Sequence, residues 1–223
     1  MLDLTVIILT FNEGKHLGRA ISSLKSCAAR VIVMDSFSTD DTEQIARDYG
    51  ADFFQNTWVN YAAQFNYALA TTNITTQWVM RLDADEYLNK DLYESLVHKL
   101  SSEIHSDGYV LNRRICFMGK QLNHGGMGGY YMLRVWRNGL AKCEQRWMDE
   151  HMLLESENIS KLDGTLVDEN VNSIHWWINK HNIYAAREAV DILMPSIKSE
   201  NSKGSDLNLG YGNFTRRKLK KVY

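Results

Sequence analysis

Four short apolar runs are spaced along the first hundred residues, and segments with helical periodicity lie between them. The apolar runs, which have the length of strands, cover residues 4–9, 30–34, 51–55 and 77–82. Apolar residues at intervals of three and four predict helices over 17–24, 40–49 and 61–70. Buried strands that alternate with helices are typical of a parallel sheet with both faces covered, so we expect an α/β fold.

The pattern changes after residue 101. Strand-like runs at 108–116 and 130–136 precede a periodic segment at 179–193, which predicts a helix. Beyond it, 196–213 is rich in Ser, Asn and Gly, and 214–223 is basic. We expect a single domain over 1–195, with one half at 1–101 and a second half at 102–195. A mobile linker and a helical, basic tail would occupy 196–223.

Composition narrows the class of protein. The chain has 223 residues, of which 44% are hydrophobic and 23% charged, as in ordinary soluble globular proteins. A net charge of -2 argues against a general nucleic-acid binder. The three cysteines are widely spaced and form no CxxC motif, and we see no signal peptide. These features predict free thiols in a reducing cytoplasm.

Polar clusters follow three of the predicted strands, at 10–13, 35–40 and 83–86. Each cluster alone can be a solvated turn that caps a helix. Three at successive strand ends favour a binding site, because ligands of parallel sheets bind at the carboxyl ends of strands. In an extended chain Asp83 and Asp85 would point to the same face, where their charges repel unless a cation lies between them. Carboxylate oxygens suit Mg²⁺.

Two phosphate-binding motifs are absent from the sequence. No GxGxxG follows the first strand, and GxxxxGK[ST] occurs nowhere in the chain. This argues against a dinucleotide-binding fold and against a P-loop. A site that lacks such a glycine loop can neutralise a diphosphate through a metal ion held by acids.

Four segments of the first half, in this order and spacing, resemble the inverting family 2 glycosyltransferases of the GT-A fold: "TVIILTFNE", "VIVMDSFSTDDT", "WVNYAAQFNYAL" and "WVMRLDADEY". The resemblance covers roughly residues 3–195. It is nearest to bacterial enzymes that assemble cell-envelope polysaccharides, including those of the lipopolysaccharide core. "HGG", "LRVWRNG", "WMDEH" and "WWINKHNIYAAREAVD" resemble a capsule or exopolysaccharide subgroup. It implies a Rossmann-like, mostly parallel sheet flanked by helices, with the acceptor bound by the second half.

The resemblance also implies roles for individual residues. It places nucleotide-binding residues at Thr10, Asn12, Glu13, Asp35, Gln64, Asn66 and Asp83. Asp35 would accept a hydrogen bond from uracil N3. Asp83 and Asp85 match the DXD motif, in which Asp85 would bind Mg²⁺ or Mn²⁺ directly and Asp83 would lie nearer the ribose and the metal. For Glu86, a direct role and a solvated acid both remain open.

Inverting sugar transfer needs a base on the face opposite the leaving diphosphate and a cation that stabilises the leaving group. "WMDEH", 147–151, is the only compact acidic motif of the second half in an otherwise apolar and aromatic setting. Asp149 and Glu150 are both candidates, and neighbours in an extended chain point oppositely. Arg134 or Arg137 is a candidate diphosphate contact. His175 is a weaker candidate for the metal or the diphosphate.

The predicted activity is transfer of a sugar from a UDP-sugar to a saccharide acceptor. The resemblance implies a polyprenyl-linked acceptor at the cytoplasmic face of a bacterial inner membrane. Five cations and neighbouring apolar residues at 214–223 predict weak contact with anionic lipid, against the alternative of a solvated tail. A sugar-nucleotide pyrophosphorylase and an inactive sugar-binding module are the competing functions. The first would need a glycine-rich loop with Arg after the first strand, and the intact DXD and "WMDEH" weigh against the second.

Overall fold

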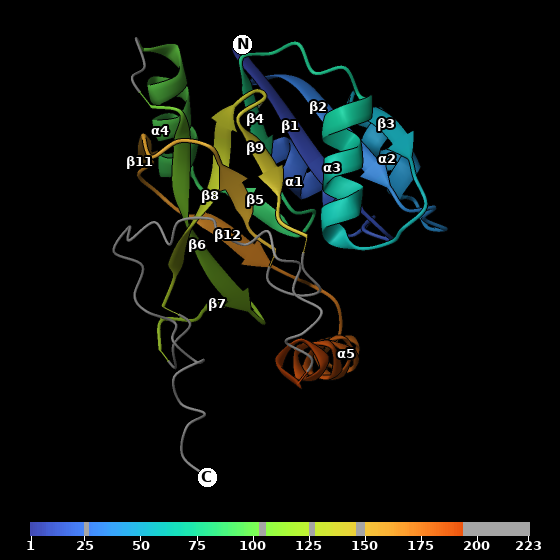
Figure 1. Ribbon diagram of the computed structural model, residues 1–223. Coiled ribbons are helices and arrows are strands. Elements are labelled where there is room, and N and C mark those ends of the chain that lie inside the picture. The colour runs from blue at the N-terminus through green and yellow to red at the C-terminus, as the bar shows by residue number, and fades with distance from the viewer. Residues whose placement is uncertain (25–26, 103–105, 125–127, 146–149, 194–223) are drawn as a thin grey trace.

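The computed structural model describes residues 1–24, 27–102, 106–124, 128–145 and 150–193 (Figure 1). The predicted tail at 196–223, with its lipid-contact segment at 214–223, lies outside the described residues, and so does Asp149. Within these ranges no helix has both the length and the apolar character that a membrane span requires.

Five helices and twelve strands make up the described parts of the chain. The helices are α1 (Leu17–Ser23), α2 (Thr42–Asp48), α3 (Tyr61–Thr71), α4 (Lys90–Ser101) and α5 (Ile174–Leu193). The strands of the first half are β1 (Leu2–Thr10), β2 (Ala28–Asp35), β3 (Asp52–Gln55), β4 (Trp78–Arg81) and β5 (Glu86–Leu88). Those of the second half are β6 (Gly108–Phe117), β7 (Lys120–Gln121), β8 (Tyr130–Arg137), β9 (Ala141–Cys143), β10 (Met152–Leu154), β11 (Ile159–Lys161) and β12 (Leu166–Glu169).

The main sheet has the strand order β3-β2-β1-β4-β8-β6-β12-β5, with β7 and β11 also paired to β6. Its first four strands are parallel, as the sequence predicts. The second half is mixed, because β8 is antiparallel to both β4 and β6, and β5 is antiparallel to β12. Strands β9 and β10 form a separate antiparallel hairpin.

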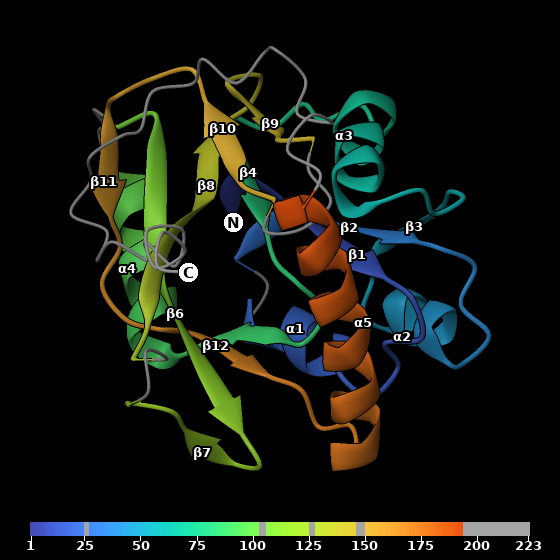
Figure 2. The same cartoon turned by 60° about the horizontal axis from the view of Figure 1, so that its bottom comes forward.

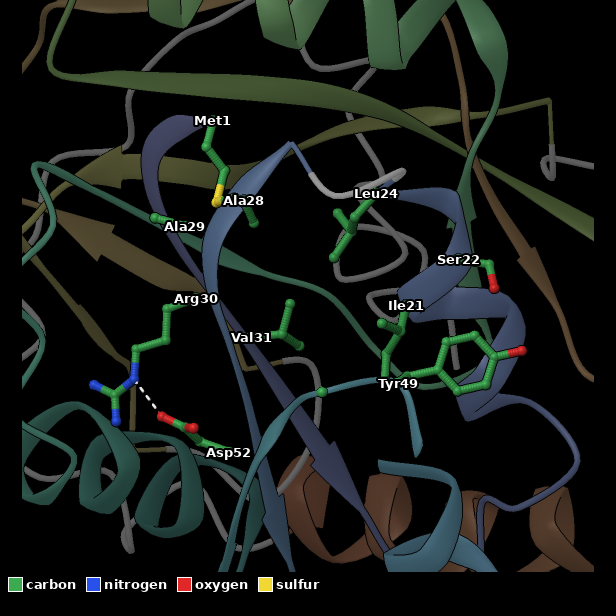
Figure 3. Close-up of a pocket in the computed structure, with 11 residues that line it drawn as sticks. Met1, Ile21, Ser22, Leu24, Ala28, Ala29, Arg30, Val31, Tyr49 and Asp52 are labelled. Atoms are coloured by element: carbon green, nitrogen blue, oxygen red, sulfur yellow. Dashed lines mark hydrogen bonds and ion pairs between the residues drawn. The ribbon is translucent and has the colours of Figure 1, made fainter. Parts of the chain in front are cut away.

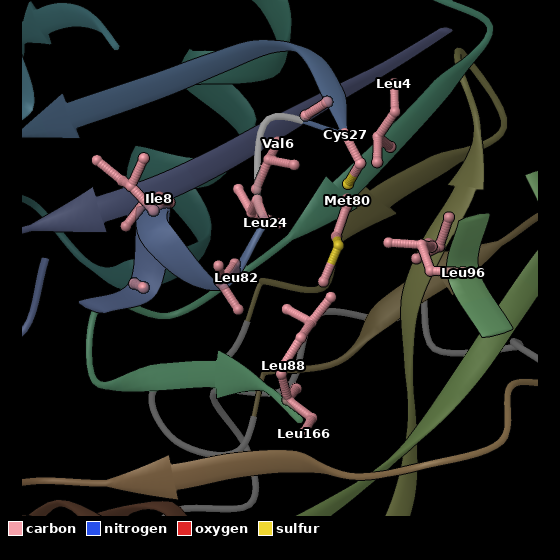
Figure 4. Close-up of a cluster of buried hydrophobic side chains, with 14 of the residues drawn as sticks. Leu4, Val6, Ile8, Leu24, Cys27, Met80, Leu82, Leu88, Leu96 and Leu166 are labelled. Carbon is pink, nitrogen blue, oxygen red and sulfur yellow. The ribbon is translucent and has the colours of Figure 1, made fainter. Parts of the chain in front are cut away.

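Alternate residues of β1 face two different apolar layers, which is why its sequence is apolar throughout. Leu4, Val6 and Ile8 join one cluster with residues of α1, β5 and α4 (Figure 4). Ile7 and Leu9 face the opposite way and join a second cluster with Phe65 of α3 and Trp136 of β8. The central strand is therefore buried on both faces, as expected for a parallel strand.

The carboxyl ends of β1, β2 and β4 lie at one edge of the sheet, and α5 lies beyond that edge (Figures 1 and 2). The three polar clusters that follow these strands are thereby brought together. An open cavity of about 500 Å³ lies at the opposite edge, among Met1, Arg30, Tyr49 and Asp52 (Figure 3). There Arg30 and Asp52 form an ion pair of 2.6 Å. This cavity is remote from the polar clusters.

The turn at Gly164, between β11 and β12, packs directly against the first turn of α4. Gly164 has a φ of +96°, and a Cβ at this position would lie 2.1 Å from the backbone nitrogen of Leu92. Next to it, Asn89 donates its backbone N–H to Thr165, and its side chain accepts the N–H of Thr165 in return. Only glycine allows the two backbones to approach so closely.

We expect Gly164→Ala to lower the free energy of unfolding by roughly 3 kcal/mol. About 1–2 kcal/mol comes from the left-handed conformation, and the rest from an overlap with backbone that no rotamer relieves. Gly139→Ala is the matched control, because Gly139 has a φ of +85° but open space around it. Chemical denaturation of both variants separates the two terms, and equal losses would contradict the close packing at Gly164.

Candidate active site

Asp35 is the last residue of β2 and lies beside the end of β1. It is fully buried, and its carboxylate accepts hydrogen bonds from Thr10 Oγ1 (2.8 Å) and from the backbone N–H of Ser38 (2.7 Å). The Ser38 hydroxyl and the Gln55 amide donate to it as well. Thr10 and Asp35 meet because they are register partners at the last position of their strands. A nucleobase that donates a hydrogen bond to Asp35 must displace one of these donors.

The loop after β1 is joined both to the loop after β2 and to the segment before α5. Asn12, with a φ of 56°, donates its N–H to Ser38 Oγ (2.7 Å). Glu13 accepts a hydrogen bond of 2.6 Å from Nδ1 of His16, and Nε2 of His16 accepts the backbone N–H of Val171 (3.0 Å). A ring nitrogen that accepts an N–H carries no proton, so His16 is the neutral Nδ1–H tautomer.

The two polar residues predicted beside the nucleotide, Gln64 and Asn66, point in different directions. Residues two apart on a helix do not face the same side. Gln64 is buried near the site, where its amide bonds Ser36 (3.1 Å) and Asn56. Asn66 instead makes two hydrogen bonds of 2.9 Å with the backbone of Cys143 in β9. Asn66 therefore joins α3 to the β9–β10 hairpin.

The DXD segment is a turn and not the extended chain that the sequence analysis assumes. The N–H of Glu86 donates to the carbonyl of Asp83 (2.9 Å), so Asp83 and Asp85 do not lie side by side. Asp83 accepts hydrogen bonds from Tyr61 Oη (2.6 Å) and Arg134 Nη2 (3.0 Å), and Arg81 lies 3.3 Å away. Burial acts to raise the pKa of Asp83, but the positive charges of Arg134 and Arg81 hold it well below its usual value.

Asp85 contacts the chain before α5. Its Oδ2 accepts a hydrogen bond from Asn170 Nδ2 (3.1 Å), and its backbone carbonyl accepts the N–H of Glu169 (3.0 Å). Oδ1 receives no hydrogen bond from any described residue. Of the two DXD acids, Asp85 is therefore the one with an oxygen available to a cation.

The carboxylate oxygens available here suit a cation that substrate phosphates bind as well. Within the described ranges, no group of three His, Cys, Asp or Glu residues is placed to hold a metal ion by itself. Mg²⁺ keeps several waters and is usually held by one or two carboxylates together with substrate phosphates. The half-buried carboxylate of Asp85 fits that mode of binding. The oxygens of Asp83 are already engaged by three side chains.

Glu86, whose role the sequence leaves open, is fully buried and not a solvated acid. Its Oε1 accepts hydrogen bonds from Arg134 Nη2 (2.6 Å) and Arg113 Nε (2.7 Å), while Oε2 accepts the N–H of Asp83 (3.0 Å). Arg113 also forms an ion pair with Asp168 of β12. Burial raises the pKa of Glu86 to about 7, and the positive charge of Arg134 opposes that rise.

We call this group of six side chains the buried ion cluster: Arg81, Asp83, Glu86, Arg113, Arg134 and Asp168. Arg81, Arg113 and Asp168 are not among the site residues predicted from the sequence. Arg81 carried a signal, because it ends the apolar run "WVM" of a buried strand. A charged residue at such a position needs a partner of opposite charge. That partner is Asp83, two residues further along the chain. Nothing in the local pattern indicates that the other members of the cluster come from β6, β8 and β12.

The two candidate arginines of β8 lie at different ends of the neighbouring strand. Arg134 joins the buried ion cluster and is 1% exposed. Arg137 pairs in register with Trp78, at the start of β4, and contacts Asp107 (3.4 Å). The carboxyl end of β4 leads to the DXD turn, so Arg137 does not join the site. The expectation that it contacts a diphosphate does not fit this position.

The remaining candidates are His175, Glu150 and Asp149. His175 is exposed on the first turn of α5, where Nε2 contacts the Asn179 side chain (3.1 Å), and Asn170 takes the place beside Asp85 instead. Glu150 is half-buried, and its backbone carbonyl accepts a hydrogen bond from Arg81 Nη1 (3.3 Å). Glu150 thus lies next to the buried ion cluster. Asp149 falls outside the described residues.

We expect Glu86→Gln to become more stable relative to the unchanged protein as the pH rises from 5 to 8. An acid whose pKa rises on folding, from 4.5 to about 7, stabilises the fold fully below pH 4.5 and loses that contribution as the pH passes 7. Glutamine does not titrate, so its contribution to the stability of the fold does not change with pH. The relative change should be on the order of 2–3 kcal/mol, or several degrees in Tm.

Thermal unfolding of both proteins at several pH values measures this difference. Glu94→Gln is the control, because Glu94 is exposed on α4 and makes only a 3.7 Å ion pair with Lys90. Its Tm relative to the unchanged protein should stay constant across the range. A Glu86→Gln difference that is equally constant would contradict the raised pKa of Glu86.

Residues 5–159 match the family described as glycosyl transferase family 2. An uncharacterised glycosyltransferase of Rickettsia typhi is 26% identical over 212 residues, which cover 90% of this chain and 72% of the relative. The lipopolysaccharide core biosynthesis glycosyltransferase LpsC of Rhizobium meliloti is 33% identical over 148 residues. Those residues cover 64% of this chain and 54% of LpsC.

Among solved structures, the fragment 1–349 of TarS from S. aureus, in complex with UDP, aligns with a TM-score of 0.54. The two are 19% identical over 75% of this chain and 60% of the fragment. This likeness supports the expected GT-A architecture, in which a sheet that is parallel in its first half is flanked by helices. Because the family match extends over more than half of the chain, the protein belongs to glycosyl transferase family 2.

Proposed function

We propose that the protein transfers a sugar, with inversion, from a UDP-sugar to a saccharide acceptor, assisted by a divalent cation at Asp85. The observation that carries this proposal is the separation of the two DXD acids. Asp83 is neutralised by Arg81 and Arg134, whereas Asp85 keeps a carboxylate oxygen free beside the strand ends that form the predicted nucleotide site. The family membership and the UDP complex of TarS support the donor class.

The residues of the site divide the work between binding and chemistry. Thr10, Asn12 and Asp35 would contact the nucleoside, and Gln64 donates a hydrogen bond to Ser36 in the loop after β2. Mg²⁺ or Mn²⁺ at Asp85 would offset the charge that develops on the leaving UDP. Asp83 stays ionised within the buried ion cluster, which keeps the turn in place while the ligand binds.

A base is needed to take the proton of the acceptor hydroxyl. As the hydroxyl oxygen bonds to the anomeric carbon, the bond from that carbon to the diphosphate breaks on the opposite face, which inverts the configuration. The "WMDEH" motif supplies Asp149 or Glu150 for this step. Support for Glu150 comes from its position, since its backbone hydrogen-bonds Arg81 of the buried ion cluster.

The acceptor belongs, by this proposal, to cell-envelope polysaccharide synthesis. The likeness to LpsC, a lipopolysaccharide core enzyme, supports a saccharide acceptor. A polyprenyl-linked acceptor at the cytoplasmic face of the inner membrane, with weak lipid contact through 214–223, completes the proposal. Release of UDP from a panel of UDP-sugars, with a cell-envelope acceptor extract and Mn²⁺, tests the activity. An inactive sugar-binding module would release none.

We expect turnover to stop in excess EDTA and to return with Mg²⁺ or Mn²⁺. Asp85→Asn should lower turnover by about a hundredfold or more, because the cation loses its carboxylate and several kcal/mol of charge stabilisation. Asp91→Asn, at an exposed position of α4, serves as the control for the loss of one acid. Full turnover in EDTA would refute the role of the metal.

Either Glu150→Gln or Asp149→Asn should lower kcat by about a hundred- to ten-thousand-fold, the usual effect of removing a general base. Binding of the UDP-sugar should be retained, because the base acts on the acceptor. Steady-state kinetics together with calorimetric titration of UDP separate the two effects. If both variants stay within a few-fold of the unchanged enzyme, the base lies elsewhere.

A further inference from the structure

The segment 170–172, which leads into α5, is bonded to two segments at the strand ends. Lys15, in the loop after β1, donates to Asn172 (3.3 Å), and His16 of the same loop accepts the N–H of Val171. Asp85, in the DXD turn, accepts from Asn170. Figure 2 shows the result, in which α5 crosses in front of the carboxyl end of the sheet. Helix α5 therefore begins beside the DXD turn.

Lys180 lies in the second turn of α5. It is half-buried, with its ammonium 4.7 Å from the ring centroid of Trp176 and 5.6 Å from that of Tyr184. Burial acts to lower the pKa of Lys180, but Tyr184, which hydrogen-bonds the ammonium, and the negative charges of Asp85 and Glu13 raise it. The charge of Lys180 in turn acts on Asp168. These three acids come from the DXD turn, the loop after β1 and β12. Lys180 thus belongs to the electrostatic surroundings of the site.

The other cations near the DXD turn are already committed. Arg81, Arg113 and Arg134 pair with acids of the buried ion cluster, and Arg19 pairs with Glu169 at 2.6 Å. Within the described residues, by contrast, the ammonium of Lys180 has no acid at ion-pair distance. A protonated amine that is held between two rings, close to an acid with a free oxygen, is placed to meet an incoming anion.

We propose that Lys180 is a phosphate-binding residue, which contacts the diphosphate of the nucleotide donor from the side of α5. The inference rests on the proposed function and names a residue beyond those given there. An ammonium on a flexible stem is a compact charge that suits phosphate oxygens of variable position. A cation at Asp85 on one side and Lys180 on the other would share the charge of the diphosphate. Helix α5 would then form the second wall of the donor site.

Binding measurements on the full chain in Mg²⁺ test this role. We expect Lys180→Met, which keeps the apolar stem between the rings, to weaken UDP binding about tenfold or more. Uridine, which has no phosphate, should bind equally well to both proteins. Lys180→Arg should restore most of the UDP affinity. Lys99→Met, at an exposed position of α4, should leave both affinities unchanged.

The two ligands separate phosphate binding from a structural role. Equal loss of uridine and UDP affinity in Lys180→Met would show damage to the fold or to the nucleoside pocket and would overturn the inference, as would an unchanged UDP affinity. Binding of inorganic pyrophosphate distinguishes a failure of the Lys180 inference from a failure of the proposed function. If the unchanged protein binds no UDP, the proposed function fails. The effect of Lys180→Met on pyrophosphate binding then still supports or overturns a phosphate site.

Discussion

The buried ion cluster is the constraint on which the site depends. Asp83 and Glu86 flank the DXD turn, and Arg134 of β8 holds both of them at once. Arg113 of β6 extends the contacts to Asp168 of β12. Removal of one partner from a buried pair typically costs about 3–5 kcal/mol, because the other charge is left uncompensated. The turn is therefore fixed to three strands of the second half of the sheet, and Asp85 keeps one carboxylate oxygen that no described residue engages.

The sequence predicts the first half of the fold well for a physical reason. Strands such as β1 are buried on both faces, so their apolar runs are unbroken, and the helices between them show a regular period. The second half is harder to predict, because β9, β10 and β11 have three residues each and are too short to show a period. The helix that ends the described chain is predicted, but it begins at Ile174 and not at Asn179.

The location of the candidate site was predictable from the sequence, but the directions in which its side chains point were not. Strand-end clusters locate it, because parallel strands end at one edge. The orientation of Asp83 and Asp85 depends on a hydrogen bond that turns the chain, and Asn66 departs from Gln64 because of helical geometry. Partners from distant strands, such as Arg113 and Asp168, leave no local pattern. The family match at 5–159 ends before Asn170 and Lys180.

The β9–β10 hairpin has a consequence for how this architecture can diversify. Its stem is fixed by the pairing of Cys143 with Met152, by the N–H of Glu144 bonded to the carbonyl of His151, and by the Asn66 amide. The residues inside the stem include the acids of "WMDEH". Under the proposed function, substitutions between β9 and β10 would alter the acceptor side while the stem stays unchanged. The acceptor and donor specificities of the proposed enzyme could then evolve separately on one sheet.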